Sequence, residues 1–132
     1  ERKIAASDFF EGFFTTALNP AEIITEIRVP IPHDGFKTSY QKFFQPASRF
    51  AIVGCAAMTA TDHGKFLRAS IAFTGVSDTP FRDKNVEDAL IGKDANADTI
   101  AAAAEKAASD VDIMSDHFAS EEYRHLLALL WD

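Results

Sequence analysis

At 132 residues, 47% of them hydrophobic, the chain falls within the usual range of a single domain with its own core. Its 20 Asp and Glu residues outnumber its 13 Lys and Arg residues, and the resulting net charge of −7 disfavours nucleic acid phosphates and anionic membrane surfaces as partners. Its single cysteine, Cys55, excludes an internal disulfide, and no apolar stretch approaches the roughly 20 residues that cross a bilayer. We therefore expect a cytoplasmic protein without membrane insertion.

The first predicted strand covers residues 23–30. Apolar and polar residues alternate there, which is typical of a half-buried strand. Before it, Asp8 is expected to cap a short turn. After it, a turn is predicted from the residues Pro30, Pro32, Asp34 and Gly35.

Three further strands are predicted between residues 37 and 76. The second strand covers residues 37–44, and two longer β-type runs follow at 51–61 and 66–76. The short polar link between these runs contains Gly64, which predicts an antiparallel hairpin. Phe43 and Phe44 are adjacent in a strand, so their side chains are expected to point to opposite faces, and one of them must leave the core.

Three helices are predicted in the second half of the chain. Asp83 is expected to cap a short helix through Ile91 that ends at Gly92, and a second helix covers about residues 98–109. Its predicted apolar stripe is Ile100, Ala103, Ala104 and Ala107. Ser120 is expected to cap a third helix, whose predicted stripe is Tyr123, Leu126, Leu127, Leu130 and Trp131.

This order of elements predicts an α+β fold. An antiparallel sheet of about four strands would be followed by about three helices packed on one of its faces. Because the chain begins at Glu1 without Met and ends inside a helical pattern, we expect one domain cut out of a larger protein, without a complete active site.

The sequence contains none of the common catalytic or phosphate-binding motifs. There is no glycine-rich phosphate loop, no HExxH, no CxxC and no GxSxG. The four histidines, His33, His63, His117 and His125, lack the spacing of metal ligands and are interpreted as loop or surface residues. We assign no catalytic residue and no metal ligand.

Five segments, in order, resemble one family. Residues 16–30 are similar to a segment of the FAD-binding medium subunits of molybdenum hydroxylases, the carbon monoxide dehydrogenase and xanthine dehydrogenase family. Residues 40–43 and 47–54 are similar to the family's next two segments, and the match continues through residues 75–92 and 119–124. The Ser48-Arg49-Phe50-Ala51 form leans toward carbon monoxide dehydrogenase medium subunits.

The resemblance implies a domain division and a set of flavin contacts. Residues 1–20 would be a lead-in from the FAD-binding domain, and residues 21–132 would be the C-terminal domain, which lies over the isoalloxazine of FAD. By position, Ile24 matches an aliphatic residue near the ring, Lys42 matches a lysine at its polar edge, and Tyr40 should share the strand face of Lys42. From the residues alone, the favoured interpretations are core packing for Ile24, cross-strand packing for Tyr40 and an exposed strand charge for Lys42.

The resemblance also implies partners and a function. A large subunit would oxidise the substrate at a molybdopterin cofactor, and a small subunit with [2Fe-2S] clusters would pass the electrons to FAD and an external acceptor. The isolated fragment is expected to be inactive and to bind FAD weakly or not at all.

The alternative is an assembly module without flavin contact, acting through Phe43 or Phe44 and the helix at 123–131. We consider two hypotheses for Arg49, Arg82 and Arg124. Each joins domains or subunits, or each is a surface or ion-pair residue.

Overall fold

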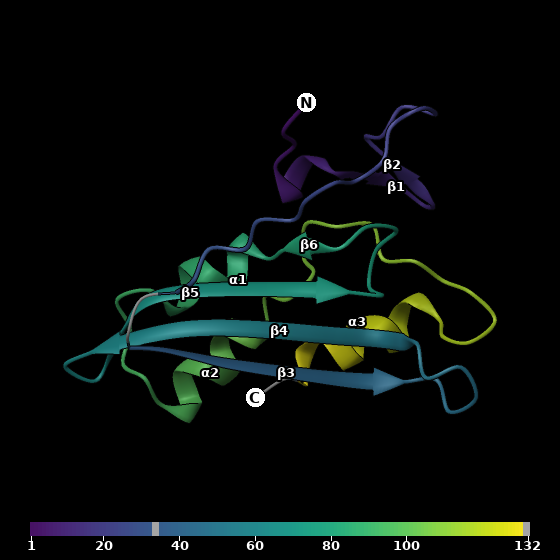
Figure 1. Cartoon of the computed structure of the whole chain (residues 1–132). Helices are drawn as coiled ribbons and strands as arrows, with labels where there is room; N and C mark the ends of the chain where they lie inside the picture. Colours follow the sequence, from purple (N-terminus) through teal and green to yellow (C-terminus); the bar gives the residue numbers. More distant parts are fainter. Residues whose placement is uncertain (33–34, 131–132) are drawn as a thin grey trace.

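The computed structural model describes residues 1–32 and 35–130, so His33, Asp34 and Trp131, which the sequence predictions include, lie outside the described residues. Its main body is a four-stranded antiparallel sheet in the order β3-β4-β5-β6, formed by β3 (Phe36–Phe44), β4 (Ala51–Asp62), β5 (Lys65–Thr74) and β6 (Phe81–Arg82). Three helices, α1 (Lys84–Leu90), α2 (Ala97–Ala104) and α3 (Glu121–Leu129), pack on one face of this sheet (Figure 1). The predicted α+β class is confirmed.

The hairpin between β4 and β5 follows directly from its turn residues. His63 and Gly64 both have positive φ, at 46° and 76°, and Asp62 pairs with Lys65 across them. Two consecutive positive φ values make a turn whose twist matches that of the flanking strands. The hairpin therefore places β4 at the centre of the sheet, between β3 and β5.

The first and third helices begin at the caps that the sequence predicts, and the second begins at Asn96, which was not predicted as a cap. Asp83 accepts a hydrogen bond from the Val86 amide, and Ser120 accepts one from the Tyr123 amide. The second helix is shorter than predicted: regular helix ends at Ala104, and turns follow up to Asp110, with Ala108 at a φ of 58°. Its predicted stripe nevertheless packs against the core, which is built from the helices and the facing sides of β4 and β5.

The prediction of a strand at residues 23–30 was wrong. The structure places no strand there, and the apolar side chains of the segment are largely exposed. The chain before β3 instead forms a short 3-10 turn at Ala6–Asp8 and a small hairpin, β1 (Phe10–Gly12) with β2 (Thr15–Thr16). Alternation marks residues 23–30 as suited to an extended conformation, but a strand also needs a neighbour for its backbone groups.

The predicted stripe of the third helix was wrong in part. The buried residues of α3 are Arg124, Leu127 and Ala128, whereas Leu126 and Leu130 are 51% and 62% exposed. The helix is rotated so that Arg124 points into the protein. Of the hypotheses for Arg124, the ion pair is the one that the structure supports: the Arg124 side chain is buried, and its partner Asp116 keeps 30% of its side chain exposed.

Arg124 joins α3 to the ends of two strands. Its Nη1 donates to the carbonyl oxygens of Ile52, at 2.5 Å, and Gly75, at 2.6 Å, while its Nη2 contacts Asp116 Oδ2 at 2.7 Å. Gly75 has a φ of 78°, and a Cβ at this position would lie 2.4 Å from the Ile52 oxygen. Glycine therefore lets the two chain segments approach closely enough to share one guanidinium.

We predict that replacing Arg124 with Met lowers the free energy of unfolding by about 3 kcal/mol, because two carbonyls and the Asp116 carboxylate lose a buried partner. Urea denaturation followed by circular dichroism measures this. The matched control is Arg68→Met on the exposed part of β5, which should change stability by no more than about 0.5 kcal/mol. Equal effects of the two substitutions would contradict the role of Arg124.

Candidate functional site

The face of the sheet opposite the helices, here called the helix-free face, carries two of the three predicted site residues. Along β3, Ser39 and Gln41 line the cavity beneath the helices, so the alternating residues Tyr40 and Lys42 point to the other side. In the register with β4, Tyr40 pairs with Ala56 and Lys42 with Gly54. The structure thus brings Tyr40 and Lys42 to one face, as their spacing predicts.

The centre of the helix-free face is a shallow hollow of about 420 Å³. Small side chains from β4 and β5, including Ala56, Ser70 and Ala72, form its floor, and Tyr40 and Arg82 line it as well. Because these residues are small, the floor is nearly flat and open. A flat, mostly apolar floor between long side chains suits a planar ligand better than a compact one.

Gly54 determines where the Tyr40 ring can lie. A Cβ on Gly54 would be 2.9 Å from Tyr40 Oη and 3.0 Å from Thr74 Cγ2, closer than side chains normally approach. The Tyr40 ring therefore extends across the strand into the space that the missing side chain leaves. It remains 59% exposed, so one side of the ring is free for a contact.

Lys42 adds an available positive charge beside this ring. Its Nζ donates to the Arg49 carbonyl oxygen at 3.1 Å, and it takes part in no ion pair among the described residues. Two of its three N–H donors are not used by this bond. The ammonium can therefore bind an anionic or carbonyl-rich edge of a ligand.

Arg82, at the far side of the hollow, is already neutralised. Its Nε and Nη2 donate to the two carboxylate oxygens of Glu87, each at 2.8 Å, and its Nη2 also donates to Ser70 Oγ. Burial raises the pKa of the Glu87 carboxyl, but hydrogen bonds from Lys84, the Ile71 amide and Arg82 lower it, and its net pKa lies below the usual value. Glu87 therefore stays ionised, and this group closes the edge of the sheet.

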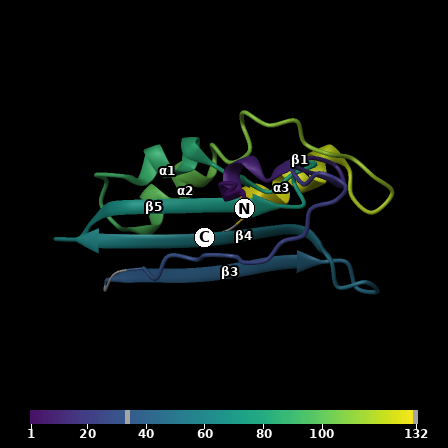
Figure 2. The ribbon, with the colours of Figure 1, turned by 45° about the horizontal axis from the view of Figure 1, so that its top comes forward.

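Ile24, the third predicted site residue, lies on a different segment. Residues 22–32 have no regular secondary structure and pass on the side of the sheet away from the helices (Figure 2). Ile24 is 51% exposed, and other large apolar side chains of the segment are also exposed, namely Ile23, Ile27, Val29 and Ile31. The structure thus places the segment that contains Ile24 on the same side of the sheet as Tyr40 and Lys42, where it forms a separate strip of exposed apolar residues.

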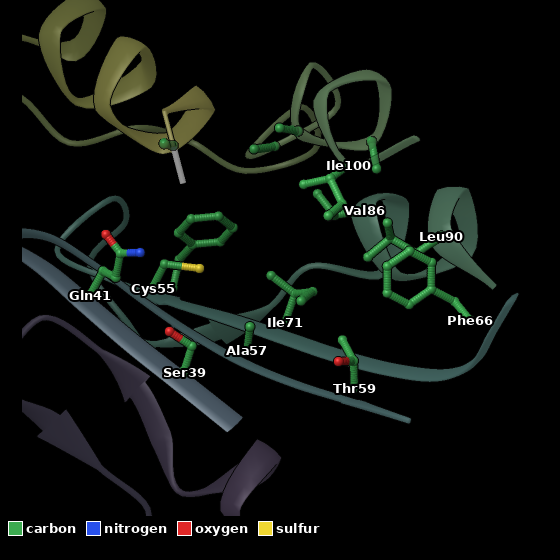
Figure 3. A pocket seen from close by; sticks show the side chains of 15 residues that line it. Ser39, Gln41, Cys55, Ala57, Thr59, Phe66, Ile71, Val86, Leu90 and Ile100 are labelled. Carbon is green, nitrogen blue, oxygen red and sulfur yellow. The ribbon is translucent and has the colours of Figure 1, made fainter. Parts of the chain in front are cut away.

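The opposite side of the sheet holds an apolar cavity of about 200 Å³ (Figure 3). Cys55, Ile71 and Phe73 line it from the sheet, and Val86, Leu90 and the alanines of α2 line it from the helices. Burial, and then the charge of Asp83, raise the pKa of the Cys55 thiol to about 11, which keeps it protonated and unreactive at neutral pH. The lining residues include no ionised group, so this cavity is part of the core layer.

Two features of the site were missed by sequence reasoning. Gly54 lies in the interior of a strand, which is a known signal of close approach by another group. Arg49 has a φ of 62°, in the left-handed region, and nothing in the sequence of its loop predicts this.

Over residues 1–32 and 35–130, no three His, Cys, Asp or Glu side chains form a group that could hold a metal ion. The helices in these ranges are all too short or too polar to cross a membrane.

Known proteins give a consistent set of matches. The model of the CO dehydrogenase flavoprotein C-terminal domain family matches residues 38–130. The glyceraldehyde dehydrogenase medium chain of Sulfolobus acidocaldarius is 38% identical over 93% of this chain and 43% of its own length. The carbon monoxide dehydrogenase medium chain of Hydrogenophaga pseudoflava is 28% identical over 96% of this chain and 44% of its own length.

Solved structures give the same result. A carbon monoxide dehydrogenase from Hydrogenophaga pseudoflava superposes with a TM-score of 0.84 and 30% identity over 92% of this chain and 42% of that chain. A reconstituted CO dehydrogenase from Oligotropha carboxidovorans gives 0.89 and 29% over 98% of this chain and 45% of that one. This chain therefore spans less than half the length of the relatives that it matches.

We predict that Gly54→Ala displaces the Tyr40 ring while changing stability by less than about 1 kcal/mol, because the exposed ring can move aside. NMR contacts between the Tyr40 ring and residues 54 and 74 report the displacement. Gly12→Ala, where the nearest atom to the new Cβ is 3.8 Å away, is the control and should leave these contacts unchanged. Unchanged contacts in the Gly54 variant would show that Tyr40 does not lie over this strand.

Proposed function

Because this chain belongs to the CO dehydrogenase flavoprotein C-terminal domain family, we propose that its helix-free face covers the isoalloxazine of FAD in the medium subunit of a molybdenum-containing oxidoreductase. The supporting observation is the placement of Tyr40 and Lys42 side by side on an open floor of small residues. A tricyclic planar ring fits such a floor, and its electron-rich edge fits an ammonium that keeps two unused N–H donors.

Each of the three residues would do a different task. Lys42 would hold its charge at the pyrimidine edge of the ring, Tyr40 would stack and donate a hydrogen bond, and Ile24 would exclude water from the ring. When bound, FAD supplies the capacity to accept electrons and pass them on. A cation near the ring favours the reduced, more negative state and so raises the reduction potential.

The domain division is part of this proposal. Residues 1–20 would belong to the FAD-binding domain and residues 21–132 to the C-terminal domain. The exposed aromatic residues within 1–20 support this division, because Phe10, Phe13 and Phe14 are 46%, 60% and 96% exposed. Such side chains are expected to be covered in the complete subunit. The phosphate and adenosine ends of FAD would then be held outside residues 21–132.

The partners follow from the proposed family role. We expect a large molybdopterin subunit and a small [2Fe-2S] subunit, in a cytoplasmic complex that contains no nucleic acid. Relatives named for glyceraldehyde, carbon monoxide, nicotine and caffeine share this domain's sequence. Because enzymes named for such different compounds share this domain, we expect the substrate to be chosen in another subunit.

A second candidate function is subunit assembly without flavin contact. Phe43 of β3 and Tyr123 of α3 meet edge to face, with ring centroids 6.1 Å apart, and both are partly exposed at 43% and 39%. An exposed aromatic pair that joins two elements can anchor a partner protein. This candidate makes a different prediction for Lys42, which would then be dispensable.

We predict that Lys42→Met in the intact complex lowers the flavin reduction potential by the equivalent of about 1 kcal/mol and leaves assembly unchanged, because one cation near the ring is lost. Redox titration and size-exclusion chromatography measure the two effects. Lys37→Met is the matched control, because Lys37 is on the same strand but points to the other face. Lost assembly with a normal potential would instead support the assembly module.

We also predict that the isolated 132-residue chain retains no stoichiometric flavin and has no turnover, because it would hold only the ring end of the cofactor. Flavin absorbance after gel filtration in the presence of FAD tests this, with a complete medium subunit as the positive control. Flavin retained at one equivalent per chain would contradict the proposed division of the FAD site.

A further inference from the structure

We propose that Arg49 is a positioning residue that holds the Lys42 ammonium through its backbone carbonyl. The proposal rests on the flavin-covering function for its purpose, but its geometry can be tested separately. The Lys42 Nζ to Arg49 O distance of 3.1 Å links β3 to the loop between β3 and β4. The loop residues belong to the segment at 47–54 that the flavin proposal otherwise leaves without a role.

The loop after β3 is closed by its own hydrogen bonds. The Gln45 amide donates to the Phe50 carbonyl at 2.9 Å, and the Arg49 amide donates to the Gln45 carbonyl at 2.8 Å. The side chains of Gln45 and Ser48 accept hydrogen bonds from the amides of Ser48 and Phe50. These bonds fix the direction of the Arg49 carbonyl without help from Lys42.

Arg49 adopts a conformation that glycine would adopt at lower cost. Its φ is 62°, and a side chain in this left-handed region costs of order 1 kcal/mol relative to glycine. The guanidinium lies 5.1 Å from the centre of the Phe44 ring, which gives the side chain a favourable contact that offsets part of this cost. The side chain thus anchors the loop while the backbone presents the carbonyl.

The bond to Arg49 restricts an otherwise free lysine. An exposed lysine on a strand has many rotamers, and holding one of them costs up to about 2 kcal/mol of side-chain entropy. The charge-assisted hydrogen bond to the Arg49 carbonyl, whose direction is already fixed, offsets this loss of side-chain entropy before a ligand binds. The remaining N–H donors of Lys42 are then available beside Tyr40, where the proposed ring edge would lie.

Three variants separate this role from simple loop closure. Arg49→Gly keeps the left-handed conformation and loses the guanidinium, whereas Arg49→Val disfavours that conformation strongly because its side chain is β-branched. Arg49→Ala disfavours it less and serves if the Val variant does not fold. Hydrogen exchange of the lysine ammonium groups with water, followed by NMR in the 132-residue chain, is the readout, and Lys37 is the internal reference.

In the parent chain and in Arg49→Gly, the Lys42 ammonium should exchange roughly fivefold more slowly than that of Lys37, as expected for one additional hydrogen bond. In Arg49→Val or Arg49→Ala the two lysines should become alike. Equal exchange of Lys42 and Lys37 in the parent chain, or slow exchange of Lys42 that persists in Arg49→Val and Arg49→Ala, would overturn the proposal.

The intact complex separates this inference from the flavin proposal. If both are right, Arg49→Val lowers the flavin potential in the same direction as Lys42→Met, and Arg49→Gly does not. If Lys42→Met leaves the potential unchanged while the exchange pattern holds, the flavin proposal fails and the positioning of Lys42 stands. If Lys42→Met lowers the potential and Arg49→Val does not, the positioning role fails instead.

Discussion

The guanidinium of Arg124 is the interaction on which the arrangement of this domain depends. It binds the carbonyl oxygens where β4 begins and where β5 ends, and its ion pair with Asp116 ties the long loop before α3 to the same point. Ile52, one of its acceptors, lies two residues from Phe50, where the loop after β3 closes. A single buried charge therefore fixes α3, the central strand and the base of the loop that holds Lys42.

The sheet has two faces with different tasks, and strand register decides which residue serves which task. Phe43 faces the helices and meets Tyr123, while its neighbours on the strand include Lys42 on the other face. The register shifts between Phe43 and Phe44, at the end of β3. A slip of one residue would bury Lys42 under the helices and expose Gln41 on the floor of small residues. The site therefore depends on the same pairing that builds the core.

Local signals in the sequence were enough to predict the hairpin, the helix caps and the shared face of Tyr40 and Lys42. Gly64, Asp83 and Ser120 act through neighbours a few residues away, so their effects can be read from the sequence. Burial of Arg124 could not be predicted in this way, because its two backbone acceptors, the carbonyls of Ile52 and Gly75, lie 72 and 49 residues away along the chain. The alternating pattern at 23–30 failed for a related reason: alternation says nothing of whether a partner strand is present.

The exposed surfaces of the domain indicate which kind of ligand suits the open side of the sheet. The helix side of β4 and β5 is covered by helices, and the segment with Ile24 passes on the other side of the sheet (Figure 2). The hollow beside Tyr40 opens on that same side. In a chain with net charge −7, Lys42 keeps a positive charge without a carboxylate partner among the described residues. An exposed apolar strip, an aromatic ring and an unneutralised cation on one side together favour a flat ligand with an electron-rich edge over a purely apolar protein surface, because the latter would leave the ammonium desolvated and unpaired.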